Sequence, residues 1–128
     1  MKTYAILLFL FLAVSCKKDE LDRDPTGAVK ASVCGVNYPM RELPWLRKII
    51  EDAKVKKEEN LVTIKLFEVN GKPIFNYDSG YMSCIGCISF YCDGSPVDIT
   101  KWTVAEMKEY QSKVIAGTGK IATIWPEK

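Results

Sequence analysis

Three cysteines in the stretch SCIGCISFYC are the residues of this sequence with the most evident chemistry. Cys84 and Cys87 form a CxxC pair, Cys92 follows shortly after, and Cys34 lies far upstream. A CxxC pair is compatible with three kinds of site, which are a redox dithiol, a zinc site and structural disulfides. The residues around the pair help to decide between them.

The surroundings of the pair favour disulfides. A redox CxxC has an exposed first thiol at a helix start, whereas this pair leads into a β-like run without the Trp and Pro of thioredoxin-type sites. Zinc signals are strong with two CxxC pairs, and this chain has one, with Cys34 as the fourth candidate ligand. We expect two structural disulfides, with Cys34 paired to Cys84 or Cys92, because closing that long loop stabilises a fold by about 4 kcal/mol.

Several other chemistries are excluded. The sequence has no histidine, so Ser-His-Asp and Cys-His nucleophile systems and the HExxH zinc motif are absent. Asp78, Asp93 and Asp98 match no EF-hand spacing and are interpreted as turn residues. The net charge is +2 with both signs mixed along the chain, so no clustered basic face for nucleic acid is expected. We predict no catalytic residue, no metal and no cofactor.

Aromatic and apolar residues supply a candidate binding surface made of Trp45, Phe67, Ile74 and Tyr81. For Trp45, packing in or near the core is the favoured alternative. Phe67 and Ile74 form a predicted cross-strand pair near a hairpin tip. This pair is either covered by the second helix or an exposed contact patch.

The chain begins like an exported protein. Residues 3–15 are uncharged and mostly apolar, which is too short for a membrane-spanning helix and fits a signal-peptide core. The small residues before Cys16, and Cys16 itself, resemble the lipobox of bacterial lipoproteins, although Ala13 stands where that pattern prefers Leu. The following KKDE resembles the surface-export signal of Bacteroidota lipoproteins. The alternative is an ordinary signal-peptide cut that leaves Cys16 as a free thiol.

Lipidation of Cys16 also accounts for the odd number of cysteines, because it leaves four that can pair completely. Acyl chains such as palmitate contribute about 0.8 kcal/mol per buried CH₂ to membrane binding. We therefore expect a signal peptide over 1–15, a lipidated cysteine and flexible tether over 16–32, and one disulfide-stabilised domain over 33–128. The expected location is the cell envelope, on the periplasmic face of the outer membrane or at the cell surface.

The domain is expected to be α+β, with helices packed on a small antiparallel sheet. A helix over 41–59 has Pro44 in its first turn and an apolar face. Asn70-Gly71 predicts a type I′ hairpin over 61–80. It pairs Leu66 with Phe75 and Ile64 with Tyr77 on an apolar face, and Lys65 with Asn76 and Thr63 with Asp78 on a polar face. A third strand over 87–94, a helix opened by a Thr103/Glu106 capping box and a last strand over 120–126 complete the order α-β-β-β-α-β. The expected apolar residues of the two helices are Leu46, Ile49, Ile50 and Ala53, and Val104, Met107 and Val114.

Cys34-Gly35-Val36, followed by the segment ELPWL that ends at Leu46, resembles a family of small Bacteroidota envelope lipoproteins with a domain of unknown function. The resemblance covers Cys34 to about Asp52 well and is weaker to about Gly94. It implies an envelope lipoprotein and brings no known catalytic residue.

The sequence thus predicts a non-catalytic binding or structural module that is anchored in a lipid bilayer through Cys16. Its partner would be a protein or a small molecule that the sequence does not name. One alternative is a thiol-disulfide or metal-handling protein that uses Cys84 and Cys87. Another is an inhibitor-like protein that caps a partner.

Overall fold

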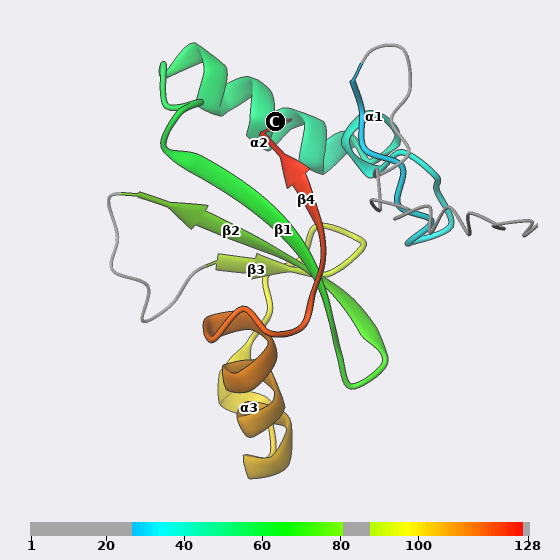
Figure 1. The fold of residues 1–128 in the computed structure, drawn as a ribbon, viewed down its shortest axis with the longest axis vertical. Helices are drawn as coiled ribbons and strands as arrows, with labels where there is room; N and C mark the ends of the chain where they lie inside the picture. Colours follow the sequence, from blue (N-terminus) through cyan, green and yellow to red (C-terminus); the bar gives the residue numbers. More distant parts are fainter. Residues whose placement is uncertain (1–26, 81–87, 127–128) are drawn as a thin grey trace, which may run out of the picture.

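The computed structural model describes residues 27–80 and 88–126, and Figure 1 shows their arrangement. Four antiparallel strands form one sheet in the order β3-β2-β1-β4. Helix α2 lies on one face of this sheet and helix α3 on the other. The elements are α1 (Pro39–Glu42), α2 (Pro44–Val55), β1 (Val62–Val69), β2 (Lys72–Ser79), β3 (Ile88–Phe90), the 3₁₀ turn η1 (Ile99–Lys101), α3 (Val104–Tyr110), the π-helical turn η2 (Gln111–Ile115) and β4 (Lys120–Trp125).

The α+β class and the antiparallel sheet are confirmed, but the expected element order omits α1 and the turns η1 and η2. The first helix starts later than expected because Leu43 precedes Pro44 and is extended, with φ −94° and ψ 107°. It ends earlier than expected, before Lys57 takes a positive φ of 57°. None of the helices within the described ranges is long and apolar enough to cross a membrane.

The hairpin between β1 and β2 forms with the predicted register. Asn70 and Gly71 both have positive φ, as a type I′ turn requires. Leu66 lies opposite Phe75. Because side chains alternate across a strand, this register sends one set of residues toward α2 and the other toward α3.

The first core lies between α2 and the sheet. Leu46, Ile50 and Ala53 are buried on α2, as expected from their spacing, and pack with the strand residues Ile64 and Phe75. Val29, upstream of the strands, also packs in this core, and its neighbour Ala28 is buried. The packed part of the chain therefore begins before residue 33, where the expected tether ends.

The second core lies on the opposite face and corrects one expectation. Phe67 and Ile74 are each only 1% exposed and pack with Tyr110 and Val114. They are therefore covered by the second helical segment and do not form an exposed contact patch. The predicted place of Val104 is also wrong, since its side chain is 87% exposed.

The predicted capping box at the start of α3 is present. The Thr103 hydroxyl accepts a hydrogen bond from the Glu106 backbone N–H, and the Glu106 carboxylate accepts one from the Thr103 N–H at 2.7 Å. The hydrogen bond from the Thr103 N–H to the Glu106 carboxylate, followed by that from the Thr103 hydroxyl, holds the pKa of Glu106 below its usual value.

We expect Thr103→Ala to lower the free energy of unfolding by about 1 kcal/mol, because an orphan N–H at the helix start loses its acceptor. Urea denaturation followed by circular dichroism measures the change. Thr103→Ser keeps the acceptor and is the matched control. An equal loss in both variants would show that the cap does not carry the effect.

Candidate functional site

The cysteines resolve into one observed disulfide. Cys34 and Cys92 are bonded, with their Cα atoms 5.5 Å apart. This is one of the two pairings expected for Cys34, and it removes Cys34 as a zinc ligand. Within the described ranges, no cluster of Cys, Asp or Glu could hold a metal ion. The expectations for Cys16, Tyr81, Cys84 and Cys87 lie outside the described residues.

Trp45 serves packing at this disulfide. Its indole N–H donates a 2.8 Å hydrogen bond to the Cys92 carbonyl, and its ring packs edge-on against Phe75, with centroids 5.4 Å apart. Gly94 allows this contact, because a Cβ there would lie 2.6 Å from the Trp45 ring. Trp45 thus joins α2 to the segment after β3 and does not line the groove described next.

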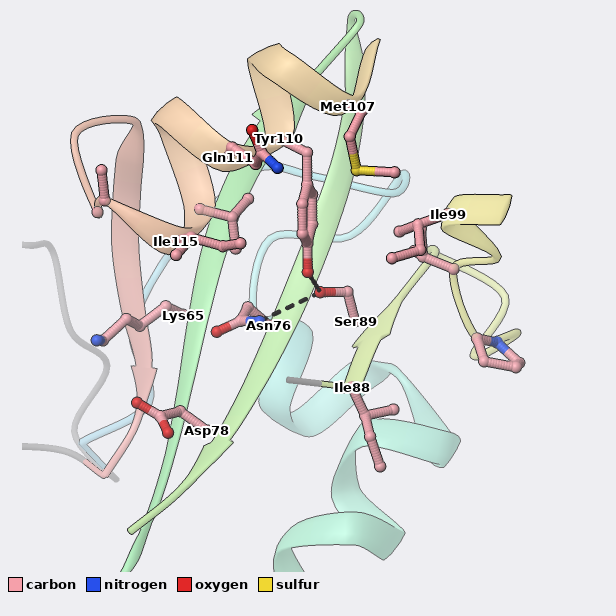
Figure 2. Close-up of a pocket in the computed structure, with 15 residues that line it drawn as sticks. Lys65, Asn76, Asp78, Ile88, Ser89, Ile99, Met107, Tyr110, Gln111 and Ile115 are labelled. Atoms are coloured by element: carbon pink, nitrogen blue, oxygen red, sulfur yellow. Dashed lines mark hydrogen bonds between the residues drawn. The ribbon is translucent and has the colours of Figure 1, made fainter. Parts of the chain in front are cut away.

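A groove of about 670 Å³ opens on the α3 side of the sheet (Figure 2). Its floor is polar and comes from three adjacent strands: Lys65 on β1, Asn76 and Asp78 on β2, and Ser89 on β3. Lys65 lies opposite Asn76, and Asn76 lies opposite Ser89, so these three form one row across the sheet. We call this site the sheet groove.

The walls of the sheet groove are largely apolar. Met107, Tyr110 and the π-helical turn η2 cover it from one side, and the connection from β3 to η1 borders it from another. The extra residue of a π-helical turn is frequently found at functional sites, and here Gln111, Val114 and Ile115 of η2 all line the groove. In Figure 2, Lys65 and Asp78 lie at one end, whereas Met107 and Ile99 lie at the other. The groove is therefore charged at one end and apolar at the other.

A buried hydrogen-bond chain crosses the floor of the groove. The Asn76 amide N–H donates to the Ser89 hydroxyl at 3.2 Å, and the Ser89 and Tyr110 hydroxyls are 2.9 Å apart. Asn76 and Ser89 are 5% and 4% exposed. Buried polar groups of this kind need partners, and this chain ties the floor to the α3 wall.

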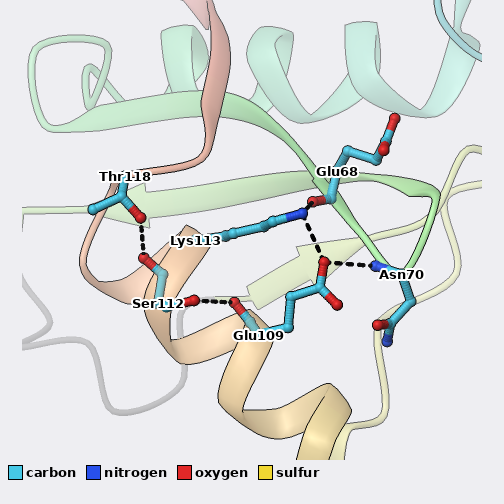
Figure 3. A network of polar contacts seen from close by, with 6 residues as sticks. All are labelled: Glu68, Asn70, Glu109, Ser112, Lys113 and Thr118. Atoms are coloured by element: carbon cyan, nitrogen blue, oxygen red, sulfur yellow. Dashed lines mark hydrogen bonds and ion pairs between the residues drawn. The ribbon is translucent and has the colours of Figure 1, made fainter.

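A second network holds the helical wall against the hairpin (Figure 3). The Lys113 ammonium pairs with the Glu109 carboxylate at 2.6 Å and donates to the Glu68 carbonyl at 3.1 Å. Glu109 also accepts the Asn70 backbone N–H. The hydrogen bond from Lys113, followed by that from Asn70, holds the pKa of Glu109 below its usual value. The groove thus has a fixed wall over a fixed floor.

Two of the three candidate calcium ligands prove to be turn residues, as expected. Asp93 accepts hydrogen bonds from the Ser95 hydroxyl and N–H, and Asp98 accepts the same pair from Thr100. These bonds lower the pKa of both carboxyls. The prediction is wrong for Asp78, which lies within β2 and lines the sheet groove.

Sequence reasoning placed Lys65, Asn76 and Asp78 on the polar face of the hairpin but did not recognise them as a site. The signal was there, since the alternation around Asn70-Gly71 puts all three on one face. Ser89 and Tyr110 gave no comparable signal, because their contact joins residues 21 positions apart.

We expect Tyr110→Phe to lower the free energy of unfolding by about 1 kcal/mol, because the buried Ser89 hydroxyl loses one of its two partners. Tyr38→Phe is the matched control, since the Tyr38 hydroxyl has no hydrogen bond within the described part of the chain. Urea denaturation of both variants measures the difference. Equal stabilities of the two variants would mean that the hydrogen bonds across the groove floor make no net contribution to the free energy of unfolding.

No family model, curated protein or solved structure matches this chain. The fold and the site themselves define a disulfide-bonded α+β domain with a half-polar groove of ligand size on one face of its sheet.

Proposed function

We propose that this protein is an envelope lipoprotein, anchored through Cys16, whose domain binds a small molecule in the sheet groove. The observation that carries the binding part is the groove itself. Its volume of about 670 Å³ lies within the roughly 300–1,000 Å³ of small-molecule sites, and it combines apolar walls with a few convergent polar groups, as such sites do.

The chemistry of the floor supports binding in preference to catalysis. Ser89 is the hydroxyl placed deepest, and its partners are the amide of Asn76 and the phenol of Tyr110. Neither is a general base at neutral pH, so neither would activate the hydroxyl as a nucleophile. Both would instead orient a ligand.

The binding role is tested by purifying the chain from its own envelope, denaturing it and identifying released small molecules by mass spectrometry. Ala116 lines the groove and is exposed, so Ala116→Trp would fill the groove without disturbing either core. Ala105→Trp is the control, on an exposed site of α3 outside the groove. We expect wild type and the control to release a bound compound on denaturation. Ala116→Trp should release about a tenth of that amount or less.

Two outcomes would contradict this proposal. A wild type that releases no more than Ala116→Trp would remove the binding role. A co-purifying protein lost only from Ala116→Trp would favour the inhibitor-like alternative, in which the exposed Ile88, Ile99 and Ile115 at the groove contact a partner.

The anchor has its own test, which is the intact mass of envelope-extracted protein after free thiols are blocked without reductant. We expect the mass of residues 16–128 plus acyl chains. An unacylated mass would contradict the lipoprotein proposal.

The thiol-disulfide alternative is favoured by one observation. The Cys34–Cys92 bond leaves Cys84 and Cys87 with only each other as partners inside the domain. Blocking thiols before and after mild reductant tests this alternative, because a redox pair opens readily. A pair that stays closed under conditions that reduce exposed disulfides would contradict it.

A further inference from the structure

The floor of the sheet groove presents the side-chain oxygen of Asn76 without a hydrogen-bond partner. Asn76 is 95% buried, since only 5% of it is exposed, and its amide N–H is directed at Ser89. Its carbonyl oxygen accepts no hydrogen bond within the described part of the chain. Figure 2 shows this oxygen turned away from Ser89, toward the Lys65 side of the groove. This oxygen is not one of the buried atoms that lack a partner, so it opens onto the groove, where a ligand can donate a hydrogen bond to it.

Two opposite charges flank this oxygen. Lys65 lies directly across from Asn76, and Asp78 follows Asn76 by two residues on the same face of β2. Lys65 and Asp78 therefore occupy diagonal positions on adjacent strands, which are about 7–8 Å apart. The ion pairs found within the described ranges involve other side chains, so Lys65 and Asp78 are not in direct contact with each other. The charged end therefore offers an ammonium and a carboxylate separately.

The far end of the groove offers only apolar contact. Ile99 and Met107 lie there in Figure 2, across Asn76 and Ser89 from Lys65. Removing such side chains from water is favourable, so a ligand with an apolar tail would gain from lying over them.

We propose that the ligand is an amphipathic zwitterion of the amino-acid class, namely a free apolar α-amino acid or a short apolar peptide. This inference rests on the proposed binding function. The ligand ammonium donates to the Asp78 carboxylate and the Asn76 carbonyl, the ligand carboxylate accepts from the Lys65 ammonium, and the apolar side chain points toward Ile99 and Met107. An apolar acid would face Asp78 with a like charge, and an apolar amine would leave Lys65 without a partner.

Titration calorimetry on the full chain in an uncharged detergent tests the head group. The probes are L-leucine, L-leucyl-L-leucine, N-acetyl-L-leucine and L-leucinamide. We expect leucine or the dipeptide to bind, and each capped leucine to bind at least about tenfold more weakly than leucine or fail to bind, because each cap removes one charge-assisted contact. If leucine binds more strongly than the dipeptide, the ligand is a free amino acid. If the dipeptide binds more strongly, the ligand is a short peptide. Absent binding of both, or equal binding of capped and uncapped leucine, overturns the inference.

Two variants assign the charges. Asp78→Asn should weaken binding of the better zwitterion about tenfold or more without weakening any binding of N-acetyl-leucine, since that probe has no ammonium and carries the same charge as Asp78. Lys65→Gln should also weaken binding of the better zwitterion about tenfold or more, without weakening any binding of leucinamide, since that probe has no carboxylate. Asp52→Asn and Lys48→Gln, both on the exposed side of α2, are the matched controls. Variants that bind the zwitterion like their controls overturn the inference.

Failure of this inference can be told from failure of the binding function. If the compound released from wild type is lost in Ala116→Trp but carries no ammonium, the groove binds a ligand and the zwitterion inference is wrong. If nothing is released and no probe binds, both are wrong.

Discussion

Replacing both Cys34 and Cys92 by serine is expected to lower the free energy of unfolding by about 4 kcal/mol. The bond joins residues 58 positions apart, and a cross-link over so long a loop strongly restricts the unfolded chain. In a domain of this size, such a loss corresponds to a fall in melting temperature of roughly 15–30 °C. Urea denaturation and calorimetry of the double variant measure both quantities.

The control for this experiment is the double variant Cys84→Ser and Cys87→Ser. A bond between these two residues would close only a very small loop, so by the same relation its removal should cost about 2 kcal/mol, or half of that loss. If the control loses as much stability as the Cys34/Cys92 variant, the long-range bond is not the main covalent constraint. A Cys34/Cys92 variant within about 1 kcal/mol of wild type would contradict the prediction directly.

Phe67→Ala is expected to lower the free energy of unfolding by about 3–5 kcal/mol, because it removes a large ring from a packed interior and leaves a cavity. The Phe67 side chain is 1% exposed between β1 and the helical segment that carries Tyr110 and Val114. Urea denaturation provides the measurement. The same helical segment forms the groove wall. Weaker packing of this segment on the sheet should therefore also weaken ligand binding.

The matched control is Val104→Ala, on a side chain that is 87% exposed at the start of α3. We expect it to change stability by no more than about 0.5 kcal/mol. This pair of variants tests whether Phe67 is a core residue or part of a surface contact patch. If Phe67 lay in a surface patch, Phe67→Ala would lower the free energy of unfolding as little as Val104→Ala does. A core position gives the loss of about 3–5 kcal/mol.

The elements that the sequence predicted correctly depend on contacts between near neighbours. Asn70-Gly71 specifies its own turn, because both positions need positive φ, and the turn then sets the register from Leu66–Phe75 outward. The Thr103/Glu106 box likewise acts over a single helical turn. The α+β class followed from these local patterns.

The errors arose where distant segments meet. Val104 fitted an apolar stripe by spacing, yet the face of α3 that packs inward carries Tyr110 instead. Ala28 and Val29 lie in a charged, Gly/Pro-containing stretch that is typical of a tether, but both are buried, and Val29 packs in the first core. In both cases tertiary packing, which the local pattern does not contain, decided which side chains are buried.

By itself the sequence determined the hairpin and its register, the start of α3, the turn roles of Asp93 and Asp98, and the choice of two partners for Cys34. Each of these depends on backbone geometry or residue chemistry that acts over a few positions. Only the tertiary structure selected Cys92 for the disulfide, buried Phe67 and Ile74, and closed the sheet groove. The groove needs Lys113 to reach Glu68 across 45 positions and Ser89 to reach Tyr110. Contacts of that range exist only after both layers of helix have packed on the sheet.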